Sequence, residues 1–563
     1  MGHGSRNVLA SRLGSAGGGA KGYRLGGALL ALVIGAGCAS EGGDEELEVL
    51  GNSKVEAVGE QGGGDGQAAT PGAIAAIPTE PEKLAKDGGP MLGAVKMAVS
   101  IYERPDHRSN KLGYLRVGTK VFRAEKPAAF DSCQGGFYSI LPRGFVCLDD
   151  GATVDMDDPL MRADIHQGNH DKPLPYTYAF VRAIAPRYYR LPTKKEQFQY
   201  EMSLKRHLRS WSRLRDKWNR IEVGSNDVRM LPEGIVLGPP PAHPPELNHL
   251  QRMGGDGSGE VPWLFDGGRQ IPNISSFKVP DYAVITNRIK RHAGVALIDA
   301  FSGDERDFAL TTDLRLIPIS KLKPARGSTF HGVELGEAWE LPMGFVKRPK
   351  GAYPRDRRKG RYKRIKKRLA YGTPIQLTGE SKRDGKYRYV ETDEGIWIRS
   401  KDLAIAPLVS KLPSVSRKGE KWIDVGLFSQ TLVLYEGTSP KYVTMVSTGK
   451  DGVGDPGKTH STPQGTFRIR DKHVTNTMDS QTVGEEFELM DVPWVQYFKG
   501  GYALHAAYWH TEFGKPRSHG CINLSPIDAY RIFHFTEPRL PAQWHGVDAA
   551  ETTGEGTLVH IHK

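Results

Sequence analysis

Apolar residues along much of this chain recur at every second position in short runs, a pattern that predicts β-strands. The clearest case is Ile423, Val425 and Leu427, which alternate with Asp424 and Gly426. Such alternation places one face of a strand in a core. Further apolar or β-branched runs follow at 431–435, 442–447, 465–469, 486–490 and 502–506. The C-terminal part is therefore expected to be mostly antiparallel sheet, with one helix over 526–535 capped by Ser525.

Two earlier segments, 93–155 and 343–408, share a second strand pattern. Each has short apolar runs divided by turns, and in each a strand leads into a Gly-Thr pair, Gly118–Thr119 or Gly372–Thr373. A small β-barrel is the natural interpretation. Both segments resemble bacterial SH3-like modules, and the resemblance implies binding of cell-wall peptide. A structural spacer is a nearly equal alternative.

The region between them, 173–335, is expected to be a third β-rich module with a helical insertion. Residues 194–222 are rich in Lys, Arg, Glu and Leu and predict a helix, whereas 238–245 is a proline-rich loop. Strands are expected at 282–286, 295–300, 308–312 and 314–319. No catalytic motif stands out in this region.

Composition supports a mainly β protein with several domains. The chain has 563 residues, of which 38% are hydrophobic, with 67 Gly and 37 Pro. One hydrophobic core does not serve a chain of that length, and frequent Gly and Pro suit β modules joined by irregular linkers.

The N-terminus predicts export. Basic residues precede an uncharged run at 25–36, which small residues and Cys38 close. This resembles a bacterial lipoprotein signal at 1–38, which implies a lipid on Cys38, contact with a membrane through that lipid, and a periplasmic location in the cell envelope. The family has Leu where this chain has Gly35, so export is better supported than lipidation. Residues 39–92 are rich in Gly, Ala, Glu and Pro, hold few large apolar side chains and are expected to be a flexible linker.

The net charge of +12 is concentrated in a basic run at 347–368. Such a run attracts polyanions. Aromatic residues are sparse in it and no nucleic-acid motif surrounds it, so nucleic acid is not an expected partner. We expect a solvated loop or an electrostatic hold on an acidic cell envelope.

Four cysteines divide into separate candidate roles. Cys133 and Cys147 lie 14 residues apart around a Gly-Gly turn, and a disulfide or two buried free thiols are equally open for them. Cys521 stands alone, 16 residues after His505. A thiolate needs a nearby imidazolium or backbone N–H groups to become a useful nucleophile. His505 is the candidate general base, and the N–H groups of Gly520 and Cys521 are candidate oxyanion donors.

The stretch HAAYWHTEFGKPRSHGCINLSPIDAYRIF resembles the catalytic segment of L,D-transpeptidases, the YkuD-type domain. Upstream, Ser447-Thr448-Gly449 and the step Thr462-Pro463-Gln464-Gly465-Thr466-Phe467 match the same family. The resemblance covers about the last quarter of the chain. It implies a β-sandwich-like catalytic domain at 421–563 that needs no cofactor and no metal.

The resemblance also implies roles for single residues. Cys521 would attack the third residue of a peptidoglycan tetrapeptide stem, expel D-alanine and pass the acyl group to an amine, forming a cross-link. The implied helpers are His505 as base, His519 as support, Gly520 as oxyanion donor, and Tyr508, Trp509, Arg517 and Asn523 as substrate contacts. Carbapenems would acylate Cys521. Where the family has Gly or Ser after the first histidine, this chain has Ala506, so a backbone carbonyl would have to orient His505.

Three alternatives stay open. Water as acceptor would make the protein an L,D-carboxypeptidase. A decayed catalytic domain would leave a wall-bound scaffold. The set His505, His510, His519 and Cys521 could instead bind zinc, although its spacing fits no common zinc motif.

Overall fold

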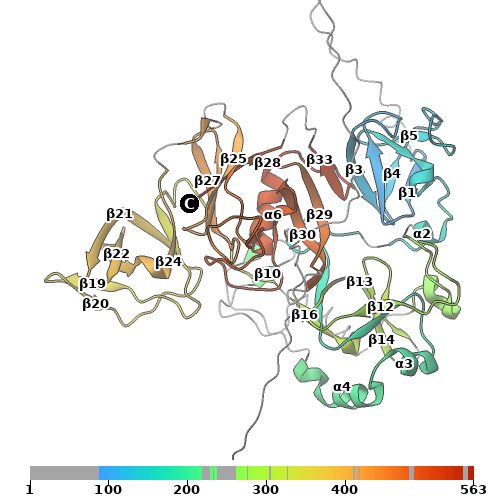
Figure 1. The fold of residues 1–563 in the computed structure, drawn as a ribbon, viewed down its shortest axis with the longest axis horizontal. Helices are drawn as coiled ribbons and strands as arrows, with labels where there is room; N and C mark the ends of the chain where they lie inside the picture. Colours follow the sequence, from blue (N-terminus) through green and yellow to red (C-terminus); the bar gives the residue numbers. More distant parts are fainter. Residues whose placement is uncertain are drawn as a thin grey trace, which may run out of the picture. The chain divides into compact units, whose positions relative to one another are not determined.

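The computed structural model describes residues 88–165, 167–218, 229–231, 234–236, 261–275, 277–303, 306–325, 327–409, 412–414, 416, 419–480, 487–549 and 556–563 (Figure 1). These ranges are mainly β, as the sequence predicted. The expected signal at 1–38 with Cys38, the linker up to 87 and the proline-rich loop at 238–245 lie outside the described residues. Within the described ranges, no helix is long and apolar enough to cross a membrane.

The first module contains seven short strands in two sheets. Their bounds are β1 Met91–Ala94, β2 Ala98–Tyr102, β3 Lys111–Arg116, β4 Lys120–Phe122, β5 Phe137–Ser139, β6 Phe145–Cys147 and β7 Ala152–Thr153. Strand β1 pairs with β4 and β7, whereas β3, β2, β6 and β5 form the edge of a larger sheet. Leu92, Val99 and Val121 are fully buried in a shared core. Neither sheet closes on itself, so the expected SH3-like barrel is not confirmed.

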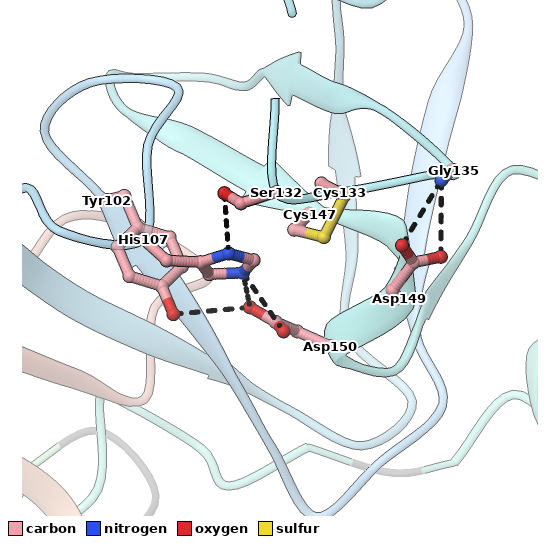
Figure 2. Close-up of a disulfide and its surroundings, with 8 residues drawn as sticks. All are labelled: Tyr102, His107, Ser132, Cys133, Gly135, Cys147, Asp149 and Asp150. Atoms are coloured by element: carbon pink, nitrogen blue, oxygen red, sulfur yellow. Dashed lines mark hydrogen bonds and ion pairs between the residues drawn. A yellow bond between two sulfur atoms is a disulfide. The ribbon is translucent and has the colours of Figure 1, made fainter. Parts of the chain in front are cut away.

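A disulfide joins Cys133 and Cys147 in this module (Figure 2). Beside it, the His107 ring lies between Ser132 and Asp150: Nδ1 is 3.1 Å from the Ser132 hydroxyl and Nε2 is 3.1 Å from the Asp150 carboxylate. Tyr102 donates to the same carboxylate at 3.2 Å. These contacts fix the loops around the bridge.

The middle region combines a sheet with two helices. Its main strands are β8 Thr177–Val181, β9 Ala185–Tyr188, β12 Ile285–Ile289, β13 Gly294–Gly303, β14 Arg306–Thr311, β15 Leu316–Pro318 and β16 Leu322–Ala325. The helical insertion forms α3 (Lys194–Tyr200) and α4 (Leu204–Trp218), and Thr193 with Glu196 makes a capping box on α3. Short elements complete the region: α2 Pro159–Arg162, β10 Arg229–Leu231, β11 Gly234–Val236 and β17 Val333–Glu334.

The second small module forms a sheet of seven strands. In sequence order these are β18 Met343–Val346, β19 Arg355–Arg358, β20 Arg361–Arg364, β21 Pro374–Asp384, β22 Tyr387–Thr392, β23 Trp397–Arg399 and β24 Leu403–Ala406. The sheet is open, with β20 at one edge and β24 at the other. The basic run was expected to be a solvated loop or an electrostatic hold on an acidic cell envelope, and its central part, 355–364, is two strands and a turn rather than a loop. It forms the antiparallel hairpin β19–β20, held to the module where Arg355 pairs with Trp397 of β23.

The C-terminal domain places one helix on two sheets. Its strands are β25 Lys421–Gly426, β26 Thr431–Glu436, β27 Ser439–Met445, β28 Gly465–Arg468, β29 Asp471–Ser480, β30 Phe487–Lys499, β31 Tyr502–Ala506, β32 Ile522–Leu524, β33 Gly546–Asp548 and β34 Leu558–His562. Helix α6, Pro526–Phe535, has the expected bounds and its Ser525 cap accepts from Asp528 N–H. Most pairs are antiparallel, but β25–β34 and β31–β32 are parallel, which the sequence did not predict.

The C-terminal domain shares sheets with both earlier regions. Strand β33 pairs with β29 and also with β3 of the first module, while Gly294 of β13 pairs with Leu489 of β30. Trp544 and Val547 are buried in the core of the first module. The boundaries of the sequence modules therefore do not divide the hydrogen-bonded sheets.

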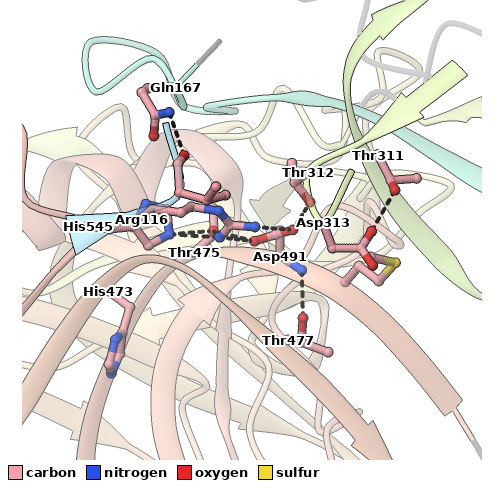
Figure 3. Close-up of polar contacts among 12 residues, drawn as sticks. Arg116, Gln167, Thr311, Thr312, Asp313, His473, Thr475, Thr477, Asp491 and His545 are labelled. Atoms are coloured by element: carbon pink, nitrogen blue, oxygen red, sulfur yellow. Dashed lines mark hydrogen bonds and ion pairs between the residues drawn. The ribbon is translucent and has the colours of Figure 1, made fainter. Parts of the chain in front are cut away.

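A buried ion pair lies where three regions meet (Figure 3). Arg116 of β3 donates to Asp491 of β30 at 2.6 Å, and both side chains are almost fully buried. Thr475 of β29 donates to the same carboxylate at 2.6 Å, and Thr312 of the middle region also donates to it. His545 Nε2 accepts from Arg116 at 3.1 Å. Each buried charge is thus paired and hydrogen-bonded, as burial of charge requires.

Candidate active site

Cys521 and His505 come from neighbouring parallel strands. In the register of β31 and β32, His505 pairs with Asn523 and Leu504 with Ile522. Cys521 lies one residue before β32, two positions before Asn523, so alternation places it on the His505 face. The packing of the two strands supports this placement. Leu504 and Ile522 belong to one hydrophobic core, whereas Cys521 belongs to another core together with Ala503 and Tyr508. The fold brings the predicted nucleophile and base to the same face of adjoining strands.

The His505 ring is oriented by the main chain. Its Nδ1 lies 3.2 Å from the carbonyl oxygen of Ala506, which supplies the partner that an alanine side chain lacks. With the proton on Nδ1, Nε2 is the nitrogen that accepts a proton. The side chain is 3% exposed, and this burial lowers the pKa of His505 to about 4.

The neutral state of His505 bears on how Cys521 loses its proton. The sequence made His505 the candidate general base and left open whether an imidazolium or backbone N–H groups favour the Cys521 thiolate; an imidazole with a pKa of about 4 is uncharged near neutral pH. It therefore fits removal of the thiol proton as the sulfur attacks, which is general-base catalysis, rather than a preformed ion pair. Cys521 itself is 2% exposed, and its Sγ lies 3.7 Å from the Gly501 carbonyl oxygen.

The turn before Cys521 is closed by hydroxyl groups. Ser518 Oγ donates to the Cys521 carbonyl at 2.5 Å and accepts from the Gly520 N–H at 3.1 Å. Thr462, from the upstream family step, donates to the Gly520 carbonyl at 2.7 Å. The Gly520 N–H was expected to hold the oxyanion, but here it is already donated to Ser518. That role requires this bond to open.

Glycine is required at position 520 by the backbone. Its φ is 121°, a backbone angle that residues other than glycine rarely adopt. A Cβ there would lie 2.5 Å from Cε1 of the Tyr502 ring. Tyr502 in turn donates to the Pro456 carbonyl at 3.2 Å, which fixes the ring against the turn.

His519 contacts another histidine. Its ring centroid lies 4.8 Å from that of His460, edge to face, and His460 Nδ1 is 3.1 Å from the Asp451 carboxylate. Neither His460 nor Asp451 was singled out in the sequence. Both lie in the loop between two family motifs, and that position was the available signal.

Arg517 and Asn523 have different surroundings. Arg517 is exposed, with its guanidinium 3.6 Å from Glu512, and is therefore accessible to a substrate carboxylate. Asn523 is buried, and its Nδ2 lies 3.3 Å from His510 Nε2. In the described part of the chain, Asn523 Oδ1 is buried without a hydrogen-bond partner. Burial lowers the pKa of His510 to about 3, so this ring is neutral as well.

Tyr508 and Trp509 were both expected to contact substrate, and the structure shows that they differ in solvent exposure. Trp509 is half-buried and its ring centroid lies 5.6 Å from that of His505. Tyr508 is only 2% exposed, so its ring is enclosed by neighbouring side chains. Its ring is covered by Tyr178 of β8 at 4.4 Å and by Phe180 at 5.8 Å.

The middle region therefore supplies part of the site, which sequence reasoning missed. Tyr178 and Ala296 share a core with Tyr508 and Cys521. Gly294 approaches so closely that a Cβ there would lie 2.1 Å from the Tyr508 hydroxyl oxygen. No strand was predicted at 177–181, and a local sequence pattern does not identify which domain a strand will cover.

The clusters of His, Cys and Asp side chains in the described ranges do not include Cys521. In the described ranges, three ligating groups come within 4.8 Å of one another in two places, His107–Cys147–Asp150 and Cys133–Cys147–Asp149. Both include cysteines of the disulfide, whose sulfurs are not thiolates. Neither includes Cys521, so the zinc set considered from sequence does not assemble in these ranges.

A family model described as the L,D-transpeptidase catalytic domain, YkuD, matches residues 420–561. Among solved structures, the L,D-transpeptidase (Yku) from Stackebrandtia nassauensis is 26% identical over 26% of this chain and 57% of its own, with a TM-score of 0.18. The catalytic domain of the E. faecium L,D-transpeptidase is 22% identical over 26% and 98%, with a TM-score of 0.20. A structure described as LD transpeptidase LdtMt1 in complex with imipenem is 17% identical over 33% and 78%, with a TM-score of 0.20. No curated protein matches the chain.

Proposed function

From the YkuD domain at residues 420–561, we propose that this protein is a peptidoglycan L,D-transpeptidase in which Cys521 is the nucleophile. The observation that carries the proposal is the parallel pairing of β31 and β32. It sets Cys521 and His505 on one face of adjoining strands, with the ring held through Nδ1 so that Nε2 can accept a proton.

The reaction would proceed in two acyl transfers. Cys521 Sγ attacks the carbonyl of the third stem residue while His505 Nε2 takes the thiol proton. The bond to the terminal D-alanine breaks, and the proton passes from His505 to the leaving amine. An acceptor amine then attacks the thioester and gives its proton to His505, and the thiol is restored. Water in place of the amine would give carboxypeptidase action.

Several residues would serve these steps without bond changes. The N–H of Cys521 would bind the oxyanion, joined by the Gly520 N–H once Ser518 Oγ is released. Arg517 would bind a stem carboxylate as an exposed cation. Asn523 Oδ1 is a buried polar atom to which a substrate amide N–H would supply the missing bond.

The proposal extends to location and inhibitors. Export with a lipid on Cys38 and wall binding by the two small modules would place the catalytic domain in the periplasm. A carbapenem would acylate Cys521 at its strained lactam carbonyl, as a thiol nucleophile permits. Imipenem occurs with LdtMt1 among the similar structures.

The deciding experiment is incubation of the full chain with purified tetrapeptide stems and an amine acceptor, followed by mass analysis. Wild type should release D-alanine and form cross-linked product, and Cys521→Ala should abolish both. Cys521→Ala also tests the assignment directly, because equal D-alanine release by the variant and wild type would refute it. Trimmed stems without a cross-link would identify the carboxypeptidase.

A further inference from the structure

The net charge of this protein resides in one hairpin and its flanks. Residues 347–368 hold thirteen Lys or Arg residues and one Asp, a net of +12. The whole chain is also +12, so the remaining residues balance to zero. Within the hairpin, Arg357, Lys359, Arg361 and Lys363 are all exposed. The charge is thus presented to solvent by a single element, which we call the basic hairpin (residues 355–364).

Like charges face each other across the two strands of the basic hairpin. In its register Arg355 lies opposite Arg364, and Arg358 lies opposite Arg361. Like charges directly opposite each other destabilise an antiparallel pair. Within the described ranges, the ion pairs of the whole run reach only two carboxylates, Asp356 and Asp402. One carboxylate, Asp356, which pairs with Arg358 and lies opposite Lys363, offsets only part of this repulsion, and a bound polyanion would supply further countercharge.

The hairpin owes its rigidity to aromatic packing beneath it. The Tyr362 ring stacks on Tyr389 of β22 at 4.0 Å, and the Arg364 guanidinium lies 3.2 Å from the Tyr353 ring centroid. These aromatic faces are therefore occupied. Single-stranded nucleic acid is bound by stacking bases on free aromatic faces, which this hairpin does not offer.

Cations face outward on both sides of the ribbon. Neighbouring residues of a strand point to opposite faces, so Arg357 and Arg358 lie on different sides. In the described hairpin no large apolar side chain is exposed. A flat lipid surface would contact one face only and is usually held by apolar residues as well. An anionic polymer network can approach both faces at once.

We propose that the basic hairpin is a second binding site for peptidoglycan, recognising the repeated carboxylates of its stem peptides. The inference rests on the proposed function, which makes this polymer the substrate. Seven of the thirteen cations are Arg, whose planar guanidinium pairs with a carboxylate through two hydrogen bonds. Because the hairpin lies outside residues 420–561, it would hold the polymer without taking part in the chemistry.

The test compares binding of the full chain to purified sacculi by sedimentation. The variant combines Arg357→Gln, Arg361→Gln, Lys363→Gln and Lys366→Gln, all at exposed positions. A matched control removes four exposed cations elsewhere, by Lys126→Gln, Arg143→Gln, Lys195→Gln and Arg206→Gln. The hairpin variant should bind about tenfold more weakly at low salt, and the control should bind like wild type. Equal binding by variant and control would overturn the proposal.

Chemical treatment of the sacculi identifies the anion. Amidation of their carboxylates should abolish wild-type binding, and retained binding would contradict the proposal. Hydrofluoric acid, which removes phosphodiester-linked polymers, should leave binding intact, and a loss would assign the site to such polymers instead. Tighter binding to phosphatidylglycerol vesicles or to single-stranded DNA than to sacculi would likewise overturn it.

Two further measurements separate this inference from the proposed function. Soluble tetrapeptides lack the polymer, so the hairpin variant should release D-alanine from them at the wild-type rate. Cys521→Ala should bind sacculi like wild type. If Cys521→Ala still releases D-alanine, the proposed function is refuted. Sacculus binding by the hairpin variant and its control would then still test whether the basic hairpin binds the polymer. Arg357→Lys with Arg361→Lys keeps the charge but loses the paired hydrogen bonds, so it should bind sacculi less tightly than wild type and more tightly than the glutamine variant.

Discussion

At the residue scale, burial sets the protonation state of two histidines in the candidate site. His505 and His510 are both neutral near pH 7, because burial lowers their pKa values to about 4 and about 3. The residue that differs from the family, Ala506, still orients His505 through its carbonyl oxygen. A change in side chain at that position thus leaves the base intact.

Activity should persist well below pH 6.5. Protonation of His505 removes the base, and since its pKa is about 4, the neutral form prevails down to about that pH. The acid limb of kcat/KM for D-alanine release should therefore have its midpoint near pH 4, about 2.5 pH units below that of an exposed histidine. A midpoint at 6.5 would show that His505 is solvated in the working enzyme. Stability across the same range should be checked by circular dichroism.

Gly520→Ala should disable the turn before Cys521. The substitution forces a Cβ to 2.5 Å from the Tyr502 ring at a φ of 121°. We expect a loss of about 1–3 kcal/mol in unfolding free energy and much slower alkylation of Cys521. Gly500→Ala is a control, because a Cβ at Gly500 meets nothing within 4 Å although its φ is also positive. Equal alkylation rates in the two variants would contradict the steric argument.

At the element scale, β8 of the middle region covers the face of the catalytic domain that carries Cys521. Tyr178 donates to the Asp491 carbonyl at 2.7 Å and packs its ring on Tyr508. Tyr508 touches Trp509 edge to face, and Trp509 lies beside His505. The position of the base is thus connected by ring contacts to a strand outside the family domain.

Tyr178→Ala should slow acylation of Cys521 by imipenem, followed by intact mass. Removing the ring leaves a cavity under Tyr508, with an expected loss of about 3–5 kcal/mol in stability, whereas Tyr178→Phe loses one hydrogen bond at about 1 kcal/mol. Tyr282→Ala is the control, since Tyr282 belongs to the same region but is 84% exposed. Because Tyr178→Phe keeps the stack, it should acylate at nearly the wild-type rate. A rate for Tyr178→Phe as low as that of Tyr178→Ala would rule out the ring contact as the cause.

At the scale of the whole molecule, one buried ion pair joins three regions of the chain. Burial alone would raise the pKa of Asp491, but Arg116 and the hydrogen bonds from Thr312 and Thr475 outweigh it and hold the pKa below its usual value. A depressed folded pKa means that this stabilisation is present above the unfolded pKa of about 3.9 and is lost as pH falls through the folded value.

Arg116→Met should destabilise the protein by about 3–5 kcal/mol, since it leaves Asp491 charged and buried without its partner. Adding Asp491→Asn should recover part of the loss, because the unpaired charge is removed and Asn tolerates the positive φ of 48° at this position. Thermal unfolding at pH 7 measures both. A double variant less stable than Arg116→Met would contradict this account.

Sequence alone predicted what depends on neighbours along the chain. Alternation identified most strands of the C-terminal domain, and Ser525 with Pro526 gave helix α6 its bounds. The spacing of His505 and Cys521, together with the family motifs, identified the candidate site. Local patterns suffice for these features because strand faces, helix caps and turns are set by residues close in sequence.

Only the tertiary structure decided what depends on partners far apart in the chain. Register in the parallel pair put Cys521 and His505 on one face, and burial keeps the His505 ring neutral near pH 7. It also buried Tyr508 under Tyr178 and turned the basic run into a hairpin. Solvent exposure, register between strands and the desolvation of a charge are properties of packed neighbours, which a one-dimensional pattern does not record.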